Sequence, residues 1–555
     1  MVDRLDEKDL NALHNESGKE VKGLETSGLA KRSLNLWNRW KAIAQFLFLG
    51  LIFGIGYTQD PIYNSPENQN TKYFHALARA GHGFLNEDWL ASTRDPLPAF
   101  TALVQFTYTF LHQEYLFYVY YILIFGLYLY SLKGVVSAVL PLERHHTRTV
   151  IFLALFFFIH IVHIDIFNID TGRDLHTGVA QQYILGPVFQ PANFGAFILL
   201  SIHLFLKRRP FWAVGMLAIA VTMHPTYFPS VGILTLLYLT VVGWQDTQKQ
   251  AFSVVRLFRL GALATILMLP VFLYMVLAFQ DTSPEFAQQA TDLIVNQRIP
   301  HHSIPQVWLA NGRAYVQAGI VAIALWVIRK HTLVVLLAIP FVLAVGLTAL
   351  QMYMDSDTLA FIAPWRMSVF LVPIATSILL GQGAIALSSL IPPGHSAQRI
   401  TSGICVGIIT AVVISGGMEQ VQKFRTQDDT IPMLTFVQET AQSGDVYLVP
   451  PDARELRKFR LYTGAAIFTN RKSHPYLDTE VLEWGQRWNL AQQFYASQPR
   501  PQQCRLLNRT LVKTYNVTHV VVPLQGLDRP CQGFTEVYRD TAYRVDILTR
   551  KNRDR

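Results

Sequence analysis

The chain has 555 residues, of which 51% are hydrophobic and only 15% are charged. Apolar runs of about 20 residues recur along it, which predicts a polytopic membrane protein and excludes a soluble multidomain protein. The formal net charge of +9 does not indicate a nucleic-acid-binding protein. Much of the basic excess lies in short loops between apolar runs, as the positive-inside rule predicts.

The N-terminal residues 1–41 are polar and charged, and we expect them to form a cytoplasmic tail. A cleaved signal peptide is not expected, because no small-residue cleavage site follows the first apolar run. The apolar runs from 42 to 417 predict about eleven transmembrane helices, at residues 42–57, 114–140, 148–166, 190–206, 210–223, 226–243, 258–279, 315–329, 331–350, 367–390 and 400–417.

Basic residues recur in every second connection between these segments, which places those connections in the cytoplasm. The long connections then lie on the outer side of a bacterial cytoplasmic (inner) membrane, at residues 58–113, 167–189, 280–314 and 351–366. Long connections in a compact protein are usually functional or disordered. These are rich in Trp, His, Pro and Asp, so we expect them to be ordered and to carry the function.

Residues 418–555 are expected to form a small extracytoplasmic α/β domain. VYLVPP (446–451) and THVVVPL (518–524) are short β-rich runs, and TIPMLTFVQETAQSG (430–444) has helical spacing. Cys504 and Cys531 lie in this domain, outside the cytoplasm, where a disulfide is permitted. Two reduced, buried thiols are the alternative.

In the first outer loop, TKYFHALARAGHGFL (71–85) has the spacing of an amphipathic helix that lies flat in the membrane interface. At 100° per residue, one narrow face carries the basic side chains Lys72, His75, Arg79 and His82. This face could bind lipid phosphates, or it could simply be solvated.

The same loop holds five carboxylates, which are Asp60, Glu67, Glu87, Asp88 and Asp95. Carboxylates at a membrane surface can act as a general base or bind a metal. They can also cap helices, and Asp95 followed by Pro96 is typical of a helix start. We favour the cap for Asp95 and a functional role for Asp60 and Asp88.

Three further outer segments carry polar side chains. NQRIPHHSIPQVW places Arg298, His301 and His302 between prolines, where they could bind a phosphate, a sugar or a metal, or be structural. Arg366, in APWRMS, could clamp a phosphate or snorkel to the interface. DIFNIDTGRDLH adds Asp165, Asp170, Arg173, Asp174 and His176. Charge is thus gathered at the outer interface, whereas a transporter places polar groups near the middle of its spans.

This arrangement resembles the GT-C superfamily of integral-membrane glycosyltransferases, which includes protein O-mannosyltransferases and the aminoarabinose transferase of lipid A. Its members have a cytoplasmic N-terminus, a long first outer loop with interfacial helices, and often an outer C-terminal domain. KYFHALARAGHGFLNEDW (72–89) is similar to the second half of their first loop, with Asp88–Trp89 in place of an Asp-Trp pair. The adjacent Asp-Glu pair of the family is absent, and Asp60 and Glu67 are the candidates for it.

The sequence also resembles a group of bacterial multispan membrane proteins without an assigned reaction. They share the DWLxxTxDPxP stretch, the RxPHH stretch and a tail similar to FRLYTGAAIFTNRKSHPY (459–476). The GT-C resemblance implies inverting transfer of a sugar from a polyprenyl-phosphate donor to a glycan, lipid or protein acceptor. Its partners would be that lipid-linked donor and membrane lipids, with no nucleic acid.

The resemblance implies that Asp60 or Asp88 is the catalytic base, and that Arg298 and Arg366 stabilise the leaving phosphate. The remaining candidates for substrate binding are Glu67, Lys72, His75, Arg79, Trp89, Asp95, His301 and His302. A cofactor is not identified, and a divalent metal stays open. The alternatives are a transporter or lipid flippase, or a non-enzymatic membrane assembly protein.

Overall fold

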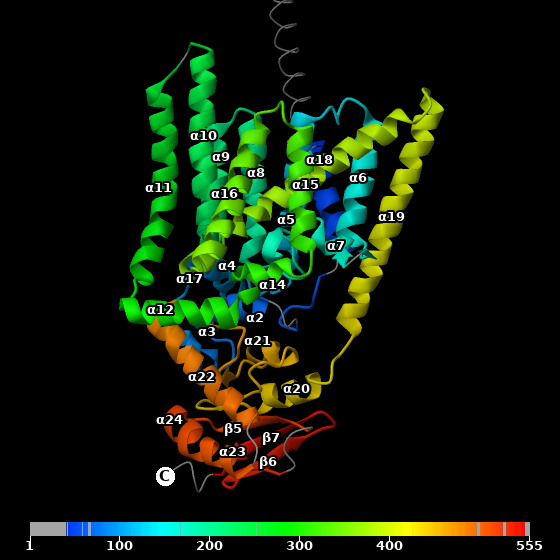
Figure 1. Ribbon diagram of the computed structural model, residues 1–555. Helices are drawn as coiled ribbons and strands as arrows, with labels where there is room; N and C mark the ends of the chain where they lie inside the picture. The colour runs from blue at the N-terminus through cyan, green and yellow to red at the C-terminus, as the bar shows by residue number, and fades with distance from the viewer. Residues whose placement is uncertain are drawn as a thin grey trace, which may run out of the picture.

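The computed structural model describes residues 40–41, 43–57, 59–64, 68–166, 168–250, 252–496, 500–524 and 529–549. Figure 1 shows long helices standing side by side, with the C-terminal strands at the far end of the molecule. A layer of short helices lies between these two parts. The fold is therefore mainly helical, with one small sheet region near the C-terminus.

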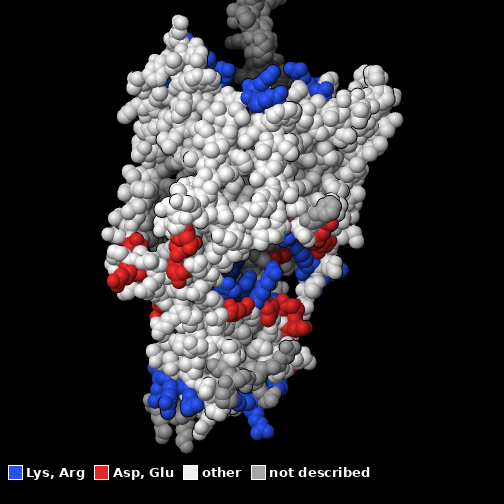
Figure 2. Space-filling model, viewed as in Figure 1, with Lys and Arg blue, Asp and Glu red and all other residues white. Residues whose placement is uncertain are grey.

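Among the described residues, six helical stretches are long and apolar enough to cross a membrane. They contain α5 (Leu116–Val139), α10 (Phe228–Gln248), α11 (Val254–Ala278), α16 (Leu333–Met354), α17 with α18 (Asp357–Ile362 and Ser368–Ser389) and α19 (His395–Arg425). Figure 2 shows a band of surface almost free of charged residues over this part of the molecule. The chain is thus built as a membrane protein.

The predicted count of about eleven spans is not supported. The other five predicted spans form apolar helices of only 10–17 residues, whereas a span needs about 20. They are Ile43–Gly56, α6 (His146–Ile161), Pro191–Leu206 with η4 (Pro191–Gly195) and α8 (Ala196–Leu206), α9 (Pro210–Met223) and α15 (Arg313–Val327). Four of these helices were predicted to within two residues of their bounds, so the error lies in counting helices of this length as spans. Only the predicted 148–166 extends past its helix, because α6 ends at Ile161 and the chain after it is extended.

The apolar helices differ in how much of their surface other helices cover. The most hydrophobic window of α5 is 56% buried inside the molecule, whereas those of α11 and α19 are each only 17% buried. Exposed apolar side chains such as Phe258 and Leu277 cover the outside of α11. Contiguous exposed apolar surface of this kind needs a non-aqueous neighbour, which the hydrocarbon of a bilayer supplies.

Short elements form a layer at those ends of the apolar helices that face the C-terminal domain, which are called the outer ends, with their loops called the outer loops. The first outer loop contains α2 (Gln69–Lys72), α3 (Phe74–Arg79), η1 (Leu85–Glu87), η2 (Trp89–Ser92) and α4 (Pro98–Thr109). The second contains β1 (Asp165–Ile166), β2 (Ile169–Asp170), α7 (Thr171–Asp174) and η3 (Val179–Gln181). The later loops contain η5 (Pro225–Tyr227), α12 (Pro284–Asp292), η6 (Leu293–Arg298), α13 (Pro300–Ser303), α14 (Pro305–Leu309) and η7 (Pro364–Met367).

The prediction of a flat interfacial helix over 71–85 is wrong. The segment forms two short helices, α2 and α3, and α3 is largely buried, although Arg79 at its end is 49% exposed. Phe74, Ala76 and Leu77 are fully buried, while His82 on the basic face bonds to Tyr108 Oη and to the carbonyl of Leu461. The C-terminal domain thus contacts Lys72 and His82, which belong to the face predicted to meet water or lipid phosphate.

The C-terminal part contains a five-stranded mixed sheet in the order β4-β3-β5-β7-β6. β3 is parallel to β4 and β5, and β7 is antiparallel to β5 and β6. The strands are β3 (Val446–Leu448), β4 (Ala466–Ile467), β5 (His519–Pro523), β6 (Phe534–Arg539) and β7 (Tyr543–Leu548). The helices are α20 (Ile431–Thr440), η8 (Glu455–Lys458), α21 (Phe459–Thr463), α22 (Asp478–Ala496), α23 (Arg500–Leu506), η9 (Leu507–Leu511) and α24 (Val512–Tyr515).

The boundary of this C-terminal domain differs from the predicted one at residue 418. That position lies inside α19, which continues to Arg425, so the domain begins after it with α20 at Ile431. Figure 1 shows α19 descending beyond the other long helices toward α20. The helix therefore leads the chain from the apolar part directly to the sheet region.

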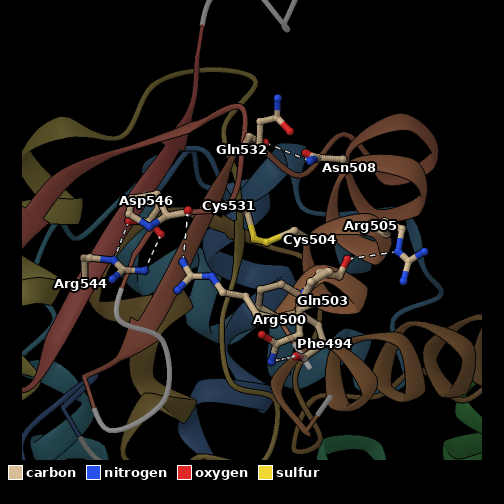
Figure 3. Close-up of a disulfide and its surroundings, with 12 residues drawn as sticks. Phe494, Arg500, Gln503, Cys504, Arg505, Asn508, Cys531, Gln532, Arg544 and Asp546 are labelled. Carbon is tan, nitrogen blue, oxygen red and sulfur yellow. Dashed lines mark hydrogen bonds and ion pairs between the residues drawn. A yellow bond between two sulfur atoms is a disulfide. The ribbon is translucent and has the colours of Figure 1, made fainter. Parts of the chain in front are cut away.

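A disulfide joins Cys504 to Cys531, with an S–S distance of 2.02 Å (Figure 3). It ties α23 to the turn before β6, where Asn508 Nδ2 also donates to the carbonyl of Gln532 at 3.0 Å. The structure thus confirms the disulfide over the alternative of two reduced thiols. Cys405 is buried in α19 and is free.

Candidate functional site

A cavity of about 620 Å³ lies at the outer ends of α6 and α15. Its polar lining comes from elements far apart in the sequence and includes Tyr57, His160, His163, Asp170, Arg173, Asp174, Thr177, Gln181, Tyr183, Asn311, Arg313, Gln317, Glu419 and Lys423. In Figure 2, basic and acidic side chains gather in and around a hollow where the uncharged band ends. Charged groups from distant segments of the chain therefore meet at this cavity.

Asp174 anchors the charged wall of this cavity. Its carboxylate lies 3.2 Å from Arg173 Nε and 3.2 Å from Arg313 Nε, and it accepts a bond of 2.9 Å from the backbone of Asp170. Asp174 is buried, so two guanidinium groups and an N–H satisfy a charge that would otherwise be costly. The side chains of Arg173 and Arg313 are 51% and 30% exposed, and donors of both remain available to a ligand.

Asp170 stands at the edge of the same wall with one side open. Both of its carboxylate oxygens lie 3.0 Å from His163 Nδ1, and one caps the backbone N–H of Gly172 at the start of α7. The two-stranded ladder of β1 and β2 holds this turn. A carboxylate oriented by a histidine, with access to a cavity, has the arrangement of a general base.

Asp60 lies in an adjoining hollow of about 460 Å³, which shares Glu419 and Lys423 with the cavity. Its backbone N–H donates to the carbonyl of Pro187 at 2.7 Å, and its carboxylate lies 3.5 Å from Lys423 Nζ. Asp60 and Asp170 are both close enough to Tyr57 for their charges to act on its hydroxyl. The structure thus brings the predicted acid after the first apolar helix to the cavity.

The wall made by residues 178–187 is conformationally strained. Ala180 and Gln181 both adopt left-handed conformations, with φ of 56° and 57°. His302 Nδ1 donates to the carbonyl of Ala180 at 2.6 Å, and Ser368 Oγ donates to that of Val179 at 3.3 Å. Strained backbone of this kind persists where the surroundings fix it, and it clusters at binding sites.

Asp88, the other predicted base, does not line the cavity. Both of its oxygens bond to Arg460, at 2.7 and 3.0 Å, and they also accept from the backbone of Leu90 and Ile467. Its side chain is 0% exposed. The role of Asp88 as a base is therefore corrected to that of a buried structural ion pair, since no substrate hydroxyl can reach it.

The helix cap predicted for Asp95 is not formed, because Leu97 is the N-cap residue of α4 and Asp95 holds the turn before it. Its carboxylate accepts from the backbone of Leu97 and from Thr101 Oγ1, and it lies 3.1 Å from Arg79 NH1. The helix starts two residues later than Asp95–Pro96 predicts, because Pro98 rather than Pro96 is its first residue. Arg79, which was expected to bind lipid phosphate or substrate, pairs with Asp95 while its side chain remains 49% exposed.

The other predicted side chains form a second, basic region under the C-terminal domain. Lys72 Nζ donates to Tyr476 Oη at 3.0 Å, and Arg298 NH2 donates to the carbonyl of Lys472 at 2.8 Å. Burial raises the pKa of Tyr476, but the stronger opposing effect of Lys72, Arg298 and Arg366 leaves it below its usual value. The predicted phosphate ligands Arg298 and Arg366 are thus associated with Tyr476 rather than with the lining of the cavity.

Two of the remaining predicted residues have contacts away from the cavity, and the third lies outside the described residues. Burial lowers the pKa of His75 to about 4, against the attraction of Asp95. The indole of Trp89 lies under the guanidinium of Arg487, at 4.7 Å. Glu67 lies outside the described residues.

Metal-ligand geometry is not found in the part of the chain that the structure describes. There, no group of three or more His, Cys, Asp or Glu side chains is placed to hold an ion. His301 and His302 are adjacent, with ring centroids 4.1 Å apart, but no carboxylate joins them in such a group.

The sequence did not single out the most informative contacts of the cavity. Arg313 and Lys423 belong to no recognisable motif. Each lies near the end of a mainly apolar helix, α15 or α19, where a charged residue is common. One pattern could have indicated them: each is a basic residue at the end of an apolar run, while a different loop predicted on the same side carries acidic residues. Asp170, Arg173 and Asp174 were visible as a charged cluster, without a role for each.

The comparisons with known proteins match one part of the C-terminal domain. Residues 428–491 match a family model described as a domain of unknown function (DUF6798). The matched stretch runs from just before α20 into α22 and contains Arg460, Arg471 and Lys472. No curated protein matches the chain, so the chemistry of the cavity is argued from its residues.

Proposed function

We propose that the protein is a membrane glycosyltransferase of the GT-C type, which moves a sugar from a polyprenyl-phosphate donor to an acceptor. The observation that carries this proposal is the cavity at the outer ends of the apolar helices, where Asp170 and Asp174 face Arg173 and Arg313, with Asp60 beside them. A lipid-linked donor has an apolar tail and an anionic headgroup, and this site offers both environments.

The reaction would begin with removal of the proton from the acceptor hydroxyl by Asp60 or Asp170. The acceptor oxygen then bonds to the anomeric carbon as the bond from that carbon to the phosphate oxygen breaks, with inversion. The lipid phosphate leaves with the bonding electrons. Arg173, Arg313 and Lys423 would stabilise the negative charge that develops on it.

We place the N-terminus in the cytoplasm of a bacterium and the C-terminal domain outside its inner membrane. Figure 2 supports this, since Lys and Arg gather at the end of the molecule opposite the C-terminal domain. In this arrangement the five shorter apolar helices also cross the membrane. A helix shorter than the bilayer is accommodated by local thinning and by its neighbours.

The test uses full-length protein in nanodiscs with a polyprenyl-phosphate sugar. The donor is first identified by mass spectrometry as the lipid-linked sugar that accumulates in a deletion strain. Asp60→Asn or Asp170→Asn should lower turnover by about 10²–10⁴-fold, as expected for loss of a general base. Asp165→Asn is the matched control, because Asp165 is an exposed carboxylate in the same loop that does not line the cavity.

Full turnover of both Asn variants would contradict the assignment of the base. A deletion strain that accumulates no lipid-linked sugar would contradict the glycosyltransferase itself. If the purified protein instead moved a labelled polyprenyl phosphate between leaflets without bond cleavage, the flippase alternative would replace it.

A further inference from the structure

A second, smaller pocket lies where the outer loops meet the C-terminal domain. It has a volume of about 230 Å³, and its lining consists of Arg298, His301, Arg457, Arg471 and Lys472. Two of these residues come from the loop before α15, and three come from the C-terminal domain. All five are basic, and none of the lining residues is a carboxylate.

Backbone contacts in both directions hold this lining in place. Arg298 NH2 donates to the carbonyl of Lys472 at 2.8 Å, and Arg471 NH2 donates to the carbonyl of Gln297 at 2.7 Å. Each segment therefore fixes an arginine of the other. Arginine held against a neutral carbonyl keeps its full charge, so the joint gathers positive charge without neutralising it.

One donor of this lining is left without a partner. The Nε of Arg298 is buried and has no hydrogen-bond partner among the described residues. A buried, unsatisfied donor on a charged group costs about 1–3 kcal/mol or more, so it normally marks a site for a ligand or an ion.

Arg471 has one exposed carboxylate near it. The carboxylate of Asp452 lies 4.0 Å from Arg471 NH1, and its side chain is 42% exposed. Exposed pairs at this distance contribute little. The guanidinium of Arg471 is also stacked on Trp488, at 5.5 Å from the ring centroid.

The titration of the lining reflects this excess of positive charge. Burial, together with the charges of Arg298, Lys472, Arg471 and Arg457, lowers the pKa of His301 to about 4. Burial also lowers the pKa of Arg298 to about 10, with Arg457 and Arg471 adding to the effect. Such a field favours an anion.

We propose that this pocket binds a phosphate or diphosphate group, which joins the loop at 298–301 to the C-terminal domain. Arg298 and Arg471 present forked donors that match phosphate oxygens, and Lys472 adds a mobile point charge. The site is distinct from the proposed reaction cavity, with which it shares no lining residue. The proposal therefore does not depend on sugar transfer.

The test is a titration of full-length protein, in nanodiscs of neutral phosphatidylcholine, with inorganic diphosphate. Calorimetry should detect binding that weakens as salt rises, because the contacts are ionic. Arg471→Gln and Lys472→Gln should each weaken it about 10-fold or more, whereas the control Arg505→Gln, an exposed arginine of the same domain, should not. Asp60→Asn should bind normally, which separates this test from that of the proposed function.

A second arm identifies the source of the phosphate. Nanodiscs that contain phosphatidylglycerol should abolish diphosphate binding if the natural ligand is a lipid headgroup, and should leave it unchanged if the ligand is free in solution. Diphosphate binding of wild-type strength in both Gln variants would overturn the proposal. So would the absence of binding to the wild-type protein in neutral nanodiscs.

Discussion

Asp88 and Arg460 form a two-pronged ion pair across the joint between the first outer loop and the C-terminal domain, at 2.7 and 3.0 Å. Both side chains are almost completely buried, at 0% and 1% exposure. The ring of Phe74 lies 5.2 Å from the guanidinium and completes its enclosure. Loss of either residue would leave the other charge buried without a counter-charge, because water cannot reach either group in the folded protein.

Asp88→Asn should destabilise the protein by about 3–5 kcal/mol, because it leaves Arg460 buried without its counter-charge. Thermal unfolding of the purified protein measures this loss. Glu143→Gln is the control, since Glu143 and its partner Lys133 are 60% and 30% exposed and the pair lies on the surface. A stable Asp88→Asn variant that lost only catalysis would return Asp88 to the list of bases.

A close approach of two glycines makes the same joint sensitive to a single methyl group. Gly83 has φ of +55°, and an added Cβ would lie 2.5 Å from the carbonyl oxygen of Gly464. Gly81 has φ of +77° but open space around it. Gly83→Ala should therefore lower the free energy of unfolding by about 1–3 kcal/mol more than Gly81→Ala. Equal costs would mean that the backbones separate easily.

The disulfide permits a test of stability and of topology together. Reduction should cost about 3–4 kcal/mol in the C-terminal domain, because the bond closes a loop of 27 residues in the unfolded chain. Alkylation of denatured, unreduced protein taken from cells should modify only Cys405, and Cys405→Ser should modify nothing. Three modified cysteines would contradict an oxidised, extracytoplasmic domain.

Because of the buried His302, we expect the protein to be less stable in acid than at neutral pH. Burial, followed by the charge of His301, lowers the pKa of His302 to about 3 from a usual value of 6.5. The unfolded chain takes up this proton below pH 6.5 while the folded protein does not. The stabilisation is thus complete above pH 6.5 and is lost as the pH falls toward 3.

His302→Gln keeps a side-chain donor near Ala180 but cannot titrate. Its stability should fall less steeply between pH 6 and 5 than that of the wild type, by roughly 1 kcal/mol. Thermal melting at the two pH values measures the difference. Parallel slopes for the two proteins would show that His302 is already protonated in the folded state.

Sequence patterns predicted the apolar helices and their order because hydrophobicity is a local property. They also identified the β-rich runs of the C-terminal domain and the two cysteines. They failed at the first outer loop, where the basic face of 71–85 reads as solvated. Lys72 and His82 bond instead to Tyr476 and Leu461, about 400 residues later, and no local pattern encodes such contacts.

Only part of the candidate site could be predicted from the sequence. Asp60 was singled out because an acid directly follows an apolar run, and the structure places it beside the cavity. Asp88 has the same residue type in the same loop, but its partner Arg460 decides its role. In the sequence, a carboxylate that could bind substrate cannot be told from one that is paired with an arginine. The difference depends on contacts with residues far along the chain.

The ion pair of Asp88 and Arg460 can form only late in the synthesis of the chain. Its two members are 372 residues apart in the chain. At about 5–20 residues per second, the ribosome adds Arg460 roughly 20–75 s after Asp88. During that interval the aspartate of the early loop remains hydrated and the joint stays open. A nascent chain that stops before residue 460 therefore leaves the ribosome with this loop unsealed, however well its apolar helices have packed.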